Sequence, residues 1–153
     1  MYAGLLMIVV VLGIILGPWP DWWSIYLPPS AGAAFRLREV SYLVRFYPCQ
    51  SGAVRNWKII RTNPGAASWF RAVAVEALTP SAMVYGLVGL QETDSVRYRE
   101  RILRLRPHQL ADTIQVVDSM SVHVMDLRAL LPDIERGTLR HIWLNPTQLP
   151  ECD

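Results

Sequence analysis

Residues 1–19 carry no charged side chain, and this run limits the possible folds more than any other feature. As a helix, residues 1–17 would rise about 25 Å, against a bilayer hydrocarbon core of roughly 30 Å. A cleaved signal peptide is the competing interpretation. The run has no Lys or Arg at its start and no small-residue cleavage site close behind it. We therefore expect residues 1–19 to form one uncleaved transmembrane anchor.

Residues 20–36 are rich in proline and aromatic residues, and we expect them to form an interfacial linker. The stretch from Pro18 to Pro29 should lie extended or as a short turn along the surface. Proline fixes the backbone and removes hydrogen-bond donors, while Trp and Tyr favour the headgroup region. The aromatic rings of this region either face lipid or contact a protein. Two glycines of the anchor have i, i+4 spacing, and they either pack against another helix or face lipid. The residues concerned are Gly13, Gly17, Trp19, Trp22, Trp23 and Tyr26.

The sidedness of the chain follows from where its basic residues lie. None occurs after the anchor until Arg36, and the α-amine alone lies before it. This balance slightly favours a cytoplasmic amino terminus and a periplasmic body, anchored in a bacterial inner membrane. Cys49 and Cys152 would suit a disulfide in that oxidising compartment, or they are two unrelated thiols.

The body, residues 37–153, is predicted to be one mainly α-helical domain that has room for one or two short strands. Capping residues predict helix starts at four places, and Gly86 and Gly89 would permit the close approach of a neighbouring helix. A helix stop is predicted at Gly137. Residues 37–60 fit either a strand or a helix. The four starts are Asn63-Pro64, Thr79-Pro80, Asp94 or Ser95, and Asp126.

The stretch from Thr79 to Leu90 reads T-P-S-A-M-V-Y-G-L-V-G-L and is followed by Asp94 and a basic helix. With its surroundings, residues 63–137, it resembles a helical hairpin of the HEAT-type repeat proteins, in particular exported bacterial proteins with a T-P-x-x-x-x-Y-x-L-x-G-L signature. The chain has no clear internal repeat of fixed period. The resemblance implies a small α-solenoid fragment, a fold used for binding.

Signatures of the common catalytic and cofactor sites do not occur in this sequence. It has no GxSxG, HExxH, P-loop, GxGxxG or CxxCH motif, and its histidines and cysteines lack zinc-ligand spacing. A serine of Ser119-Met120-Ser121, together with His123 and Asp118 or Asp126, supplies the residue types of a triad. Triads are normally assembled from distant segments, however. We expect no enzyme activity, no metal, no cofactor and no small-molecule substrate.

The net charge of +2 gives nucleic-acid binding no support. The densest charge lies in residues 97–106, where helical spacing places Arg97, Arg101 and Arg104 on one face. That face would meet anionic lipid or an acidic partner, or be simply solvated. The sequence thus predicts a non-catalytic accessory subunit that anchors to integral membrane subunits of a larger complex, photosynthetic or respiratory. The alternative is a free-standing tethered module that recruits a soluble partner.

Overall fold

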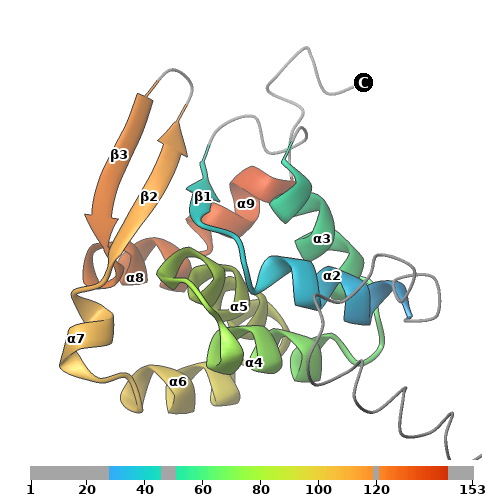
Figure 1. Cartoon of the computed structure of the whole chain (residues 1–153). Helices are drawn as coiled ribbons and strands as arrows, with labels where there is room; N and C mark the ends of the chain where they lie inside the picture. The colour runs from blue at the N-terminus through green and yellow to red at the C-terminus, as the bar shows by residue number, and fades with distance from the viewer. Residues whose placement is uncertain (1–27, 46–50, 119–120, 145–153) are drawn as a thin grey trace, which may run out of the picture.

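The computed structural model describes residues 28–45, 51–118 and 121–144, which are drawn in colour in Figure 1. Helices dominate this part of the chain, and three strands form one small sheet. In chain order the elements are α2 (Pro29–Leu37), β1 (Tyr42–Val44), α3 (Gly52–Arg61), α4 (Ala66–Glu76), α5 (Pro80–Thr93), α6 (Ser95–Leu103), α7 (Pro107–Leu110), β2 (Thr113–Asp118), β3 (Ser121–Asp126), α8 (Leu127–Glu135) and α9 (Thr138–Leu144).

The predicted transmembrane helix requires correction. Within the described residues no helix has both the length and the apolar character needed to cross a membrane. The most apolar candidate, α5, has 14 residues, which rise about 21 Å and fall short of a hydrocarbon core of roughly 30 Å. The predicted span, residues 1–19, lies outside the described residues. The single-pass description of the chain, which depended on that helix, is withdrawn.

The helix α2 occupies the last residues of the predicted linker. Pro28 is the residue before the helix and Pro29 is its first residue, a position where proline is tolerated since the first N–H groups have no helical partner anyway. The prolines therefore begin a helix here instead of preventing one. Ala33 and Leu37 on its inner face are fully buried, so α2 belongs to the core of the domain.

Three of the four predicted helix starts are confirmed. The side chains of Thr79, Asp94 and Asp126 accept backbone N–H bonds in the first turns of α5, α6 and α8. The fourth start differs: Asn63 Oδ1 accepts the N–H of Gly65 at 2.8 Å in a local turn, and α4 begins only after that turn. The predicted stop at Gly137 is confirmed, since this residue has a φ of +71° just after α8.

The central element is α5, which contacts α3, α4, α6, α8, β1 and β2. Its residues from Ser81 to Leu90 are all buried. A Cβ added to Gly86 would lie 2.4 Å from the backbone nitrogen of Ala74, and one added to Gly89 would lie 2.2 Å from the Phe70 ring. The predicted role of these two glycines in close helix packing is therefore confirmed.

The sheet has the strand order β1-β2-β3, with β1 parallel to β2 and β3 antiparallel to it. This exceeds the one or two short strands that we expected. For residues 37–60 the structure gives both alternatives: a three-residue strand at Tyr42–Val44 and a helix at Gly52–Arg61. The β2–β3 hairpin was not predicted, and in Figure 1 it rises from one end of the molecule beside β1.

Candidate protein-binding surface

The outer edge of β1 is closed by two side chains. Tyr85 Oη accepts a hydrogen bond from the Val44 N–H at 3.1 Å, and Trp143 Nε1 donates one to the Val44 carbonyl at 2.8 Å. Both bonds are buried, and burial raises the pKa of Tyr85 far above its ordinary value, although the bond from Val44 opposes this shift. The hydroxyl therefore stays neutral, and this edge offers no free polar groups at Val44.

An aromatic cluster holds these two side chains in place. The rings of Tyr85 and Trp143 stack with centroids 4.8 Å apart, and Trp57 meets Trp143 edge-on at 5.3 Å. Trp57 also contacts Phe70 at 5.6 Å. Because all four rings are fully buried, they fix the closed edge of the sheet firmly to the helical core.

The opposite edge of the sheet, along β3, is open. This strand pairs with β2 on one side, and no described strand pairs with its other side. All its residues are exposed except Met125, which is half-buried. Protected edge strands commonly carry Lys, Pro or a bulge, but residues 121–125 contain no Lys, Arg, Pro or Gly. Among the described residues, the outer backbone edge of β3 is therefore left without a strand partner.

The two faces of the sheet differ strongly. Leu43, Ile114 and Val116 lie on the inner face and are buried. On the outer face the register aligns Val44, Val117 and Val122 in one row. Exposure rises along this row: Val44 is 5% exposed, Val117 is half-buried and Val122 is 61% exposed. The apolar outer face is thus uncovered toward β3.

A second row on the outer face consists of Tyr42, Gln115 and Val124. Val124 is 64% exposed and Tyr42 is 38% exposed. We define the hairpin surface as the exposed side chains of Tyr42, Val122 and Val124 together with the open edge of β3. It combines unpaired backbone groups with apolar side chains, which is the chemistry that strand-adding partners use.

Ser121 and His123, the triad candidates, lie on the inner-face side of β3, where the hairpin extends beyond the helices. Ser121 Oγ and His123 Nε2 are 2.7 Å apart and hydrogen-bonded, and both residues are exposed. Among the described residues no carboxylate forms an ion pair with His123, and Asp126 caps α8 through the Ala129 N–H. The structure therefore brings Ser121 and His123 together, while Asp126 is engaged in capping α8.

The three arginines predicted to share a helix face, two in α6 and one directly after it, have different environments. Arg97 forms an ion pair with Asp94 at 3.2 Å, and Arg104 is exposed. Arg101 turns inward and donates to the Ala74 carbonyl from two guanidinium nitrogens at 3.1 and 3.3 Å. Burial, and to a lesser extent the charge of Arg104, lowers the pKa of Arg101. Arg101 is thus a structural residue and does not share an outer face with the other two.

The contact of Arg101 replaces a missing helical bond. The Leu78 N–H, which would reach Ala74 if α4 continued, binds the Arg38 carbonyl instead at 3.0 Å. Removing the guanidinium in R101M should cost about 2 kcal/mol, because it leaves a carbonyl at the end of α4 without this charged donor. The exposed R99M variant should change stability by less than about 0.5 kcal/mol. Urea unfolding followed by circular dichroism compares the two, and equal midpoints would contradict the assignment.

Other predicted residues lie outside the described residues: Gly13, Gly17, Trp19, Trp22, Trp23, Tyr26, Cys49 and Cys152. The anchor contacts and the disulfide therefore stay predictions. Within the described ranges, no group of three or more His, Cys, Asp or Glu side chains is placed to hold a metal ion.

Comparisons with models of known protein families, with curated proteins and with solved structures gave no significant match. The resemblance of residues 63–137 to HEAT-type proteins therefore stays a prediction.

Proposed function

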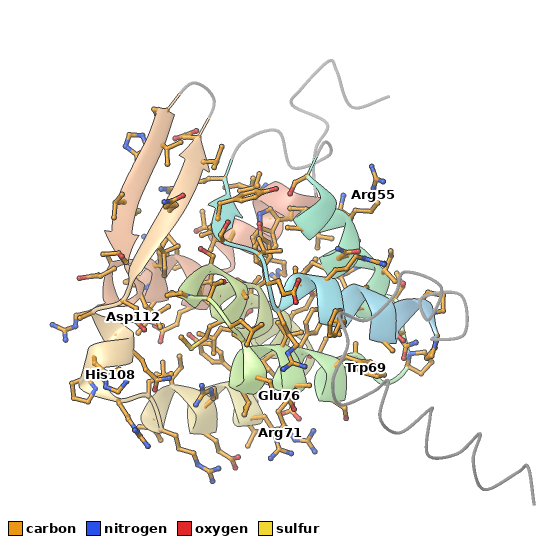
Figure 2. The ribbon with its side chains drawn as sticks, in the orientation of Figure 1. Arg55, Trp69, Arg71, Glu76, His108 and Asp112 are labelled. Carbon is orange, nitrogen blue, oxygen red and sulfur yellow. The ribbon has the colours of Figure 1, made fainter. Side chains whose placement is uncertain are left out.

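We propose that this chain is a non-catalytic accessory subunit of a larger protein assembly, and that it binds a partner protein by strand addition at β3. The difference between the two sheet edges carries the proposal. The Val44 backbone on one edge is closed by Tyr85 and Trp143, whereas β3 on the other edge has no strand partner among the described residues and carries two exposed valines. Figure 2 shows the side chains that project from the hairpin.

Strand addition would use two kinds of contact at the hairpin surface. The partner's main chain would pair with the open edge of β3, each hydrogen bond giving a net stabilisation of about 1 kcal/mol. Its apolar side chains would cover Val122 and Val124, with a gain of about 1.5 kcal/mol for each valine buried. Tyr42 would extend the same contact across the sheet.

A recruiter of a soluble partner is the second candidate, and it would use the same surface. The two candidate functions differ in how the partner protein is bound. An accessory subunit keeps its partners in fixed stoichiometry, whereas a recruiter exchanges its partner. A photosynthetic or respiratory host and a periplasmic body both stay predictions. The test therefore measures stoichiometry and the role of β3 together.

The test is purification of the full chain from its native cells under mild conditions, with V122K/V124K as the variant. The wild type should carry companion proteins in fixed ratio, and amide hydrogen exchange of residues 121–125 should slow in that complex. The variant should bind about 100-fold more weakly, because it loses two valine contacts and gains the charges that naturally block strand edges.

The matched control is V75K/L78K, which adds two lysines at residues that are 55% and 68% exposed on a different surface. This control should keep its companions. A wild-type chain that purifies alone, or a V122K/V124K variant with undiminished companions, would refute the proposal. Companions that exchange freely while β3 remains protected would instead support the recruiter.

A further inference from the structure

The outward side of α6 combines exposed aliphatic residues with arginines. Val96 is 65% exposed and Leu103 is 85% exposed, and their i, i+7 spacing places them on one side of the helix, about 10 Å apart. Arg99 and Glu100 are exposed between them. The opposite side of α6 carries the buried Tyr98 and the half-buried Arg101 and Ile102, so the helix is firmly docked by its inner side.

Three arginines in this region have no ion-pair partner among the described residues. Arg99, Arg104 and Arg106 are exposed and form no ion pair within the described ranges. Asp94 is engaged by Arg97 at 3.2 Å and by the Arg97 N–H at 3.0 Å. Glu100 is therefore the one acidic side chain left to oppose these arginines between residues 95 and 106. We define the α6 surface as Val96, Arg99, Leu103, Arg104 and Arg106.

We propose that the α6 surface binds the anionic headgroups of a phospholipid membrane, with Leu103 and Val96 entering the region beneath them. Guanidinium groups bind phosphate oxygens in bidentate fashion, and a basic helix with exposed aliphatic side chains lies in the interfacial plane. The proposal concerns peripheral contact and is independent of residues 1–27.

Charge complementarity and shape both favour a lipid surface over an acidic protein. Val96, Arg99 and Leu103 lie on α6, and Arg104 and Arg106 follow directly after it. A fluid anionic surface can adapt to these exposed side chains without a shaped groove. This contact is compatible with partner binding at β3. In Figure 1 the hairpin and α6 lie at opposite ends of the molecule, so both surfaces can be occupied at once.

The test uses the full chain with Leu103 replaced by an environment-sensitive fluorescent amino acid. A probe at this residue reports on α6 whatever other parts of the chain do on a vesicle. The vesicles are phosphatidylcholine alone, and phosphatidylcholine with roughly one-third phosphatidylglycerol. We expect a blue shift with the anionic vesicles only, and its loss at about 1 M salt, where the Debye length is about 3 Å.

The decisive variant is R99Q/R104Q/R106Q. It should raise the lipid concentration needed for half of the shift by about 100-fold, because each arginine near an anionic surface contributes about fivefold. The control R55Q/K58Q/R128Q removes the same charge from α3 and α8, and should change this concentration by less than about threefold. Thermal unfolding should show that both variants remain folded.

Three results would overturn the proposal. They are an equal shift with neutral vesicles, no shift with either kind of vesicle, and an equal loss in the two triple variants. A shift with polyglutamate but with neither vesicle would assign the α6 surface to an acidic protein, and would also overturn the lipid assignment. None of these results bears on β3, whose test uses different residues and a different measurement.

Discussion

Replacement of Trp143 by alanine should destabilise the domain by about 5 kcal/mol. The variant loses a fully buried indole that stacks on Tyr85 at 4.8 Å and meets Trp57 at 5.3 Å. It also leaves the buried Val44 carbonyl without the donor that now lies 2.8 Å away. Because small domains are stable by about 5–15 kcal/mol, W143A should be largely unfolded or close to it.

One further variant separates the contribution of the Trp143 ring from that of its hydrogen bond, and a second serves as a control at another tryptophan. W143F keeps an aromatic ring but loses the donor, and should cost about 2 kcal/mol. W69A removes a half-buried tryptophan from α4, labelled in Figure 2, and should cost roughly 1–2 kcal/mol. Urea unfolding monitored by circular dichroism gives all three values. A W143A domain within about 1 kcal/mol of the wild type would mean that Trp143 does not close the β1 edge.

Replacement of Gly86 by alanine should cost about 3 kcal/mol, because the new methyl group has no space. Its carbon would lie 2.4 Å from the nitrogen and 2.7 Å from the Cα of Ala74. These are backbone atoms, so no side-chain rotation relieves the contact, and α4 must move away from α5. This movement should also disturb the Arg101 contact with the Ala74 carbonyl.

Gly52 provides the matched control for this substitution. A Cβ at Gly52 would meet nothing within 4 Å, and alanine is the better helix former. G52A should therefore be neutral or stabilising by up to about 0.5 kcal/mol. Thermal unfolding of the two variants tests the difference, and a G86A melting temperature equal to that of G52A would contradict close α4–α5 packing.

Local signals in the sequence were sufficient for the starts of α5, α6 and α8 and for the end of α8. Thr79, Asp94 and Asp126 cap their helices through atoms within three residues, so the pattern alone contains the interaction. The hairpin also left a signal, since Ile114, Val116, Val122 and Val124 alternate with other residues. The residues between its strands lack the Asn-Gly or Asp-Gly pair that marks two-residue hairpin loops. The same stretch also contains the residue types of a catalytic triad, which suggested a different interpretation.

The candidate surfaces were harder to predict because they depend on contacts distant in sequence. Trp143 closes β1 across 99 residues and Tyr85 does so across 41, and no spacing rule connects them to Val44. The arginines of α6 show a related limit. Helical spacing grouped Arg97, Arg101 and Arg104, but tertiary packing turned Arg101 toward α4 and left Arg99 and Arg106 outside.

The hydrogen bond between Trp143 and Val44 also has a consequence for biosynthesis. Since a ribosome makes the chain from its amino terminus, β1 emerges long before both β2, its parallel partner, and α9, which supplies the indole. Until both have been synthesised, β1 lacks its partner strand and the Val44 carbonyl lacks the indole donor. Such distant pairings delay folding, so we expect β1 to complete its hydrogen bonds only after α9 has been synthesised.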